Sequence, residues 1–253
     1  MFLSTELTYR NQIVAWVLAD IFQPVILAVL WSSVARNGAA SMTVEQTVTY
    51  FFLIAIVSKF TKDYSDQFIS NKIMFGEFSK YLVKPFNYLS ESLGISIASK
   101  FLRLIIIVPF LVVSYFFIFD SIVIDSSPDT ILLTLLAVLL GFIINFLLGN
   151  TFALVAFFIK QILGLRSFYE NVVTFLSGEV IPLIAMPLWA LFFVQLLPFR
   201  YTLSFPIEIL TGQLFPFEIC NGFIIAAIWI IVLVIFYKVL YRLAIKKYEA
   251  EGI

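Results

Sequence analysis

Few side chains in this sequence are suited to acid–base or covalent chemistry. The 253 residues include no His and a single Cys, Cys220. Imidazole catalysis, Cys-His nucleophilic sites and His- or Cys-rich metal sites therefore cannot be built from this chain. Cys220 lies among apolar residues, where a lone Cys is generally a small packed hydrophobe, and we assign it no role. We expect neither a catalytic site nor a metal site.

Two polar residues near the start of the first long apolar run are the first functional candidates. Asp20 and Gln23 lie inside this run or at its edge. An acid placed in hydrocarbon marks a functional site, such as a transport path. An acid at headgroup level would instead pair with Arg103 or Lys100, and both readings stay open.

A second pair of candidates lies in the longest apolar run. Asn145 is one helical turn from Gly141 and from Gly149, and Asn150 follows directly. This stripe suits close packing against a neighbouring helix, with an amide that hydrogen-bonds across the contact. Packing and a place along a transport path are the two roles that we consider for Asn145 and Asn150.

The elements that must position these groups are membrane-spanning helices. The chain is 62% hydrophobic and 13% charged, whereas soluble domains are about half apolar and a quarter charged. Long continuous runs favour helices over the short alternating strands of a barrel. We predict one all-α integral membrane domain over residues 1–253 with six spans: Ile13 to Ala35, Val44 to Ser58, Ile97 to Phe119, Ile131 to Ile159, Val172 to Leu197 and Phe223 to Tyr241.

The basic residues give the orientation. All of the sixteen Lys and Arg except Arg36 and Arg200 fall on one side of a six-span arrangement. The positive-inside rule places that side, and both termini, in the cytoplasm. The first run is interrupted by Asp20 and Pro24, which a cleaved signal sequence would lack, so we expect it to stay as a span.

The segment from Asn71 to Leu89 has a helical pattern of apolar and polar residues. Its apolar residues Met74, Phe78, Tyr81 and Leu82 share one face, and Glu77, Lys80 and Lys84 point away from it. The pattern predicts a helix on the membrane surface that ends before Pro85. Such a helix either anchors the loop or transmits force from a partner.

The run from Val172 to Gln213 contains residues that break helices: Gly178, Glu179, Pro182, Pro187 and Pro198. One reading is a helix that stops near Gly178 and continues as a re-entrant outer segment, a candidate lid over an exit path. The other is a single kinked span.

No stretch matches the phosphate-binding G-x-x-x-x-G-K-[ST] loop, so a partner must bind any ATP that drives this protein. No span carries the series of buried carboxylates that a proton or sodium relay needs, which disfavours ion coupling. The competing functions are an ATP-independent secondary transporter or channel, a lipid-modifying enzyme, and a structural subunit.

Two stretches resemble the six-helix permeases of type-2 ABC transporters, in the branch of multidrug-type exporters. The first is FGEFSKYLVKPFNYLSESLG, with Gly76, Leu82, Lys84-Pro85 and Tyr88-Leu89 in the family's order. The second is SGEVIPLIAMPLWALFFVQLLPFRYTLSFPIEILTG, which matches the outer segment of the same branch. Glu179 departs from the pattern, since a basic or neutral residue is expected there.

The resemblance implies a transmembrane subunit of an ATP-driven exporter in a bacterial-type inner membrane. It implies a second permease, identical or related, and two ATPase copies that hold the ATP and Mg; we expect membrane lipid and no nucleic acid as other partners. The surface helix becomes a coupling helix, and the substrate is amphipathic or hydrophobic. The implied ATPase interface consists of Gly76, Glu77, Lys80, Tyr81, Lys84 and Pro85.

Overall fold

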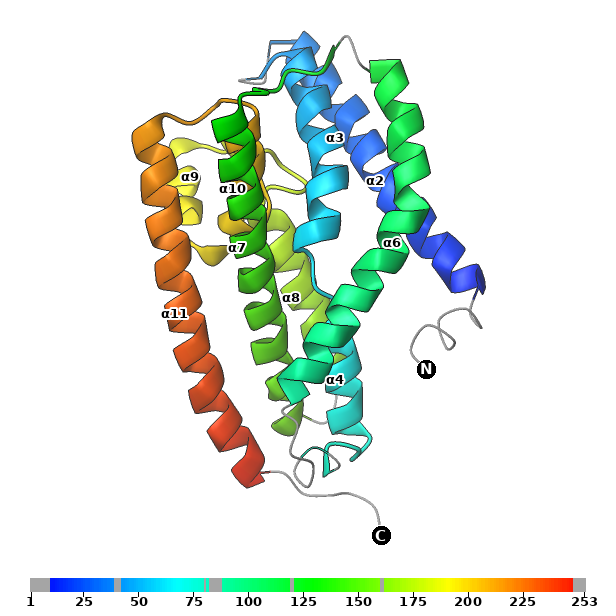
Figure 1. Ribbon diagram of the computed structural model, residues 1–253, viewed down its shortest axis with the longest axis vertical. Helices are drawn as coiled ribbons and strands as arrows, with labels where there is room; N and C mark the ends of the chain where they lie inside the picture. Colours follow the sequence, from blue (N-terminus) through cyan, green and yellow to red (C-terminus); the bar gives the residue numbers. More distant parts are fainter. Residues whose placement is uncertain are drawn as a thin grey trace.

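A computed structural model describes residues 10–38, 42–79, 81, 88–118, 121–159 and 162–247. Side chains are described for these residues except 10–21, 106, 110, 117 and 163. The described residues form helices and no strands, so the all-α class is confirmed (Figure 1). We refer to the two ends of the bundle as the upper and lower ends, as they are drawn in Figure 1.

Helices α2 (Arg10–Arg36), α3 (Val44–Thr61) and α6 (Tyr88–Ile118) form one side of the bundle (Figure 1). Helices α2 and α3 pack against each other. Helix α3 begins at a capping box, because Thr43 accepts a hydrogen bond from the Gln46 N–H and the Gln46 side chain accepts one from the Thr43 N–H. This cap fixes the upper end of α3.

Helices α7 (Pro128–Ala153) and α11 (Pro216–Lys247) form the other side. Ser127 caps α7, and Pro128 occupies its first turn, where a missing N–H costs nothing. The long apolar run does not continue as α-helix to Ile159. It tightens after Ala153 into the 3₁₀ helix η2 (Leu154–Phe157), with which α11 is in contact.

The range predicted as the fifth span is divided in the structure. Helix α8 (Leu163–Leu176) ends before Gly178, and helix α9 (Leu188–Leu196) begins only after the short 3₁₀ helix η3 (Leu183–Ala185). Gly178 has a φ of +87°, a backbone conformation that glycine adopts readily. The 3₁₀ helix η4 (Pro198–Thr202) and helix α10 (Ser204–Leu210) then pack against α7.

By length and composition, three helices within the described residues are able to cross a membrane: Tyr88–Phe116, Pro128–Phe157 and Pro216–Lys247. A shorter apolar helix covers Phe22–Arg36. The count of six spans therefore stays a prediction, while the apolar helices themselves agree with an integral membrane protein.

The surface helix predicted from Asn71 to before Pro85 is interrupted by a turn, after which Ser79 and Tyr81 are again helical. Helix α4 (Ser65–Met74) stops because Gly76 takes a φ of +70°. The Glu77 N–H donates to the Lys72 carbonyl and the Gly76 N–H donates to the Ile73 carbonyl, which is the Schellman pattern of a helix end. Amphipathic periodicity did not predict the end of α4, although Gly76 is a residue that commonly follows a helix end.

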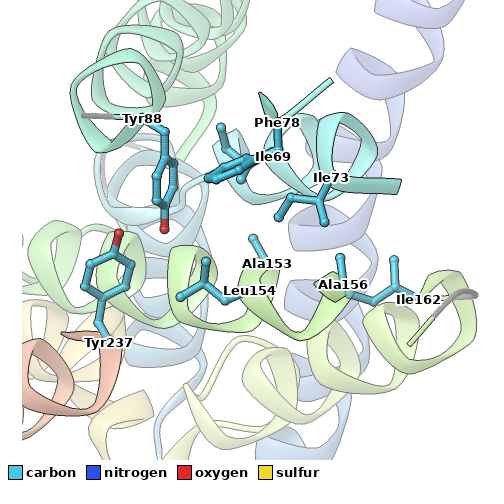
Figure 2. Packing of buried hydrophobic residues seen from close by; sticks show 9 residues of the cluster. All are labelled: Ile69, Ile73, Phe78, Tyr88, Ala153, Leu154, Ala156, Ile162 and Tyr237. Atoms are coloured by element: carbon cyan, nitrogen blue, oxygen red, sulfur yellow. The ribbon is translucent and has the colours of Figure 1, made fainter. Parts of the chain in front are cut away.

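The turn after α4 is held in a hydrophobic cluster at the lower end of the bundle (Figure 2). Phe78 is fully buried, and its ring lies edge-on to Phe157 (5.0 Å between centroids) and to Tyr88 (5.4 Å). Figure 2 shows Tyr88 and Tyr237 with their hydroxyls toward each other, so the cluster joins the turn to α6, η2 and α11.

We expect Phe78→Leu to lower the free energy of unfolding by about 2 kcal/mol, because Leu keeps the apolar bulk and loses both edge-on ring contacts. Thermal unfolding in detergent measures the change. Phe75→Leu is the matched control, since Phe75 is 75% exposed and precedes the same turn. Equal melting temperatures of the two variants would contradict the role of Phe78 in the cluster.

Candidate functional site

Polar contacts gather at the break between α3 and α4. Lys62 is extended (φ −63°, ψ 141°), so the carbonyls around it leave the helical pattern. The Asn145 amide donates to the Thr61 carbonyl (3.0 Å), and the Lys100 ammonium donates to the Lys62 carbonyl. Side chains of α6 and α7 thus satisfy the freed backbone groups, as a break in a membrane protein requires.

An ion pair connects this break to the segment after α8. The Lys62 ammonium lies 2.7 Å from Glu179 Oε1, and the Gln23 amide of α2 donates to the same oxygen at 3.5 Å. The structure therefore brings together Gln23, Glu179 and, through Thr61, Asn145. A cavity of about 20 Å³ lies among them. Its lining residues are Thr61, Lys62, Asn145, Val173, Ser177, Glu179, Thr202 and Leu203.

A second ion pair joins α4 to α8. The Arg166 guanidinium lies 3.3 Å from Asp66 and 2.8 Å from Glu170. The side chains of Arg166 and Asp66 are only 8% and 6% exposed. Burial raises the pKa of Asp66 to about 7, and the Arg166 charge opposes that rise.

Asn150 joins three helices close to this ion pair. It is fully buried; its Oδ1 accepts a hydrogen bond from Ser92 (2.7 Å), and its amide donates to the Phe146 carbonyl (2.9 Å). The Ser92 hydroxyl also lies 2.7 Å from the Ser65 hydroxyl, so α4, α6 and α7 meet here. A Cβ at Gly149 would lie 3.3 Å from Asp66, which shows how closely α4 approaches α7.

Gly141, the other glycine of the α7 stripe, also allows a neighbouring segment to approach α7 closely. A Cβ at Gly141 would lie 2.8 Å from the Tyr201 carbonyl, so η4 rests directly on α7. Asn145 lies between the two glycines and hydrogen-bonds to α3. In the structure this stripe is a contact surface, and Asn145 also lines the cavity.

The non-helical outer segment is fixed by side chains of distant helices. Tyr50 donates to the Gly178 carbonyl (2.8 Å), Ser204 donates to the Ser177 carbonyl (2.5 Å), and Trp31 donates to the Val180 carbonyl (3.0 Å). Pro182 and Pro187 precede η3 and α9 as their N-cap residues. Buried backbone groups of this segment thus have partners without a helix.

The predicted ATPase interface is described only in part. Gly76 ends α4, Glu77 is exposed, and Tyr81 packs against the cluster of Figure 2. Lys80, Lys84 and Pro85 lie outside the described residues. Asp20 lies in α2, and its side chain is outside the described part. Of its two suggested partners, Lys100 binds the Lys62 carbonyl and Arg103 lies 3.8 Å from the centre of the Tyr64 ring.

Sequence reasoning missed four residues of this region: Lys62, Asp66, Arg166 and Tyr50. The basic residues were used only for orientation, and Tyr50 was given no role. A usable signal was present, since Lys62 and Asp66 carry opposite charges four positions apart directly after an apolar run. Charges so close to a span are costly to bury, so each is expected to have an oppositely charged or hydrogen-bonding partner.

A second hollow, of about 720 Å³, lies at the upper end between α7, α10 and α11. Its walls are mainly apolar, with Asp125 and Thr130 at the rim. Asp125 accepts hydrogen bonds from the Ser127 N–H and the Thr130 hydroxyl, which lowers its pKa. This hollow contains none of the residues predicted for a site.

Comparison with known proteins assigns the family. A family model described as ABC-2 family transporter protein matches residues 17–252, which is nearly the whole chain. A search of curated proteins and a search of solved structures gave no match. The match agrees with the apolar helices and with the two stretches of sequence that resemble type-2 permeases. The chain belongs to the ABC-2 family of transporter permeases.

Proposed function

We propose that this chain is the membrane subunit of an ATP-driven exporter and that it forms, with a second permease, the path for an amphipathic or hydrophobic substrate. The family implies association with an ABC ATPase, which is the observation that carries the proposal. The ATPase supplies the chemistry, with its own ATP and Mg. This chain supplies the path and the contacts that transmit the ATPase movement.

Charge distribution supports a cytoplasmic lower end. The described lower ends of the helices carry five basic residues with the acid Glu91, whereas the upper ends carry Arg36 with four acids. The lower basic residues are Lys72, Lys238, Arg242, Lys246 and Lys247, and the upper acids are Glu45, Asp125, Asp129 and Glu218. Basic residues favour the cytoplasmic side of a membrane. Both termini then face the cytoplasm, in a bacterial-type inner membrane.

The contacts of the turn after α4 support its role in coupling. Phe78 anchors this turn in the lower cluster, while Glu77 beside it is exposed. Helix α4 leads from the turn to the α3–α4 break, where Lys62 binds Glu179. A push on the turn is therefore transmitted through packed side chains to the outer segment, as a rigid-body switch requires.

The deciding experiment measures ATP hydrolysis by the purified chain in lipid, with and without the ABC ATPase encoded beside it. We expect hydrolysis only in the complex, and stimulation by substrate. An ATP-independent secondary transporter or channel is the alternative. Flux through the chain alone, with no binding of the ATPase, would establish that alternative.

Charge reversal at the proposed docking surface provides a sharper measurement. We expect Glu77→Arg combined with Lys84→Glu to lower ATPase stimulation about fivefold, because charge pairs at a docking surface set the association. Arg36→Glu, a charge reversal at the upper end, is the control and should leave stimulation unchanged. Normal stimulation in the double variant would rule out docking at this turn.

A further inference from the structure

We propose that Glu179 is the binding site for a cationic group of the exported substrate and that the Lys62 ammonium occupies this site when substrate is absent. This inference rests on the proposed function and adds a substrate class to it, amphipathic organic cations. It assigns a role to the one residue of the outer segment that departs from the family pattern.

The first argument is the unequal burial of the two partners. The Glu179 side chain is 8% exposed, whereas the Lys62 side chain is 32% exposed. Glu179 also follows a backbone that Tyr50 and Ser204 hold in place. Lys62 ends α3 on a long flexible stem. The carboxylate is therefore the fixed member of the pair, and the ammonium is the member that can leave.

The second argument is the unused oxygen of Glu179. Oε1 accepts from Lys62 and Gln23, while Oε2 is buried and has no hydrogen-bond partner among the described residues. Glu179 lines the cavity of about 20 Å³, which is large enough for one water molecule. A buried carboxylate oxygen beside a polar cavity is able to accept from a donor or to pair with a cation that enters the cavity.

Two other buried acids, Asp66 and Glu208, differ from Glu179. Asp66 is held by Arg166, and the two side chains are 6% and 8% exposed. Glu208 is held by Arg200 at 2.5 Å, with both side chains 11% exposed. In each of these pairs a guanidinium is enclosed together with its acid. Only at Glu179, within this set, is the cation a lysine that extends from a more open position.

The sign of the substrate charge follows from which partner moves. If Lys62 leaves, a cationic group can take its place and the buried carboxylate stays neutralised. An anionic substrate would have to displace Glu179, whose backbone is fixed, or approach it against like charge. The geometry therefore favours organic cations over anions.

The cavity in this conformation is large enough for a water molecule and too small for a substrate, so binding requires movement of its walls. Val173 and Leu203 supply apolar surface beside the carboxylate, and Thr61 and Thr202 supply hydroxyls. Glu179 follows Gly178 directly, so a movement of the outer segment would open the cavity and move the carboxylate together. This suits a cation with an attached apolar body.

Binding of two ions of matched size and opposite charge tests the inference. Radiolabelled tetraphenylphosphonium and tetraphenylborate are titrated against the purified full chain in phosphatidylcholine nanodiscs. We expect saturable binding of tetraphenylphosphonium that is at least about tenfold tighter than that of tetraphenylborate. Glu179→Gln should weaken phosphonium binding about tenfold, and Lys62→Met should strengthen it severalfold, because the internal competitor is gone.

Glu170→Gln is the matched control, since Glu170 is an acid with a 52% exposed side chain outside the cavity, and it should bind as the unmodified chain does. If Glu179→Gln does not fold, Glu179→Asp keeps the charge and should keep the preference for the phosphonium ion. Unchanged binding in Glu179→Gln, or tighter binding of the borate, overturns the inference. Because this assay needs no ATPase, its failure leaves the proposed function standing, which partner-dependent hydrolysis tests separately.

Discussion

Replacing Arg166 with Met is expected to destabilise the protein by about 4 kcal/mol, which lowers the melting temperature by about 10 °C. Arg166 lies between Asp66 on α4 and Glu170 on its own helix, and its side chain is 8% exposed. Without the guanidinium, the buried Asp66 carboxyl has no opposite charge beside it when it is ionised. An unpaired buried charge costs far more than the intact pair contributes.

The loss should depend on pH in a definite direction. Burial raises the pKa of Asp66 to about 7 even with Arg166 present, so removal of Arg166 raises it further. A carboxyl whose pKa is raised on folding favours the folded state at low pH and loses that contribution as pH rises. The difference in melting temperature between the unmodified chain and Arg166→Met should therefore be larger at pH 8 than at pH 6.

Arg166→Met combined with Asp66→Asn is the control, because it removes both charges and keeps an amide of similar size. We expect it to recover more than half of the lost stability and to lose the pH dependence. Thermal unfolding in the same detergent measures all three variants at both pH values. A double variant as unstable as Arg166→Met, with no change between pH 6 and 8, would show that Arg166 acts through packing alone.

The fold class followed from the sequence because composition and run length decide it. Apolar helices are required when most of the chain lies in lipid. The α7 stripe was also visible, since Gly141, Asn145 and Gly149 recur at helical spacing, and all three make close contacts in the structure. Periodicity predicts which residues share a helix face, and these residues still share that face in the folded protein.

Periodicity missed one local feature and one that depends on contacts between distant residues. Helix α4 ends at Met74 although the amphipathic pattern continues, because the positive φ of Gly76 overrides face periodicity. The pairing of Lys62 with Glu179 joins residues 117 positions apart, and nothing in either local stretch indicates the other. A single sequence shows that a charge near a span needs a partner, but not which residue provides it.

One consequence of these distant contacts is that the α3–α4 break and the outer segment are joined into a single unit. The hydroxyls of Tyr50 of α3 and Ser204 of α10 lie 3.0 Å apart and donate to the Gly178 and Ser177 carbonyls, respectively. Glu179, the next residue, binds Lys62 at the lower end of α3. The short segment 177–179 therefore links α3 to α10, and its backbone geometry should affect both stability and transport.

Gly178→Ala is expected to destabilise the protein by about 4 kcal/mol. The new Cβ would lie 2.0 Å from the Ser204 hydroxyl and 2.6 Å from the Tyr50 hydroxyl, at a φ of +87° that side chains rarely adopt. Both hydroxyls must move, and each then leaves a buried backbone carbonyl without its donor. We expect a lower melting temperature and a loss of substrate-stimulated ATP hydrolysis with the partner ATPase.

Gly212→Ala separates backbone strain from the steric clash, because Gly212 has a similar φ of +66° and no atom within 4 Å of the added Cβ. It should cost only about 1 kcal/mol. Gly178→Ala combined with Ser204→Gly removes the nearest obstacle and should recover part of the stability, while the Ser177 carbonyl stays without its donor. If Gly178→Ala is as mild as Gly212→Ala, the outer segment is not held by Tyr50 and Ser204, and the fixed position of Glu179 loses its structural basis.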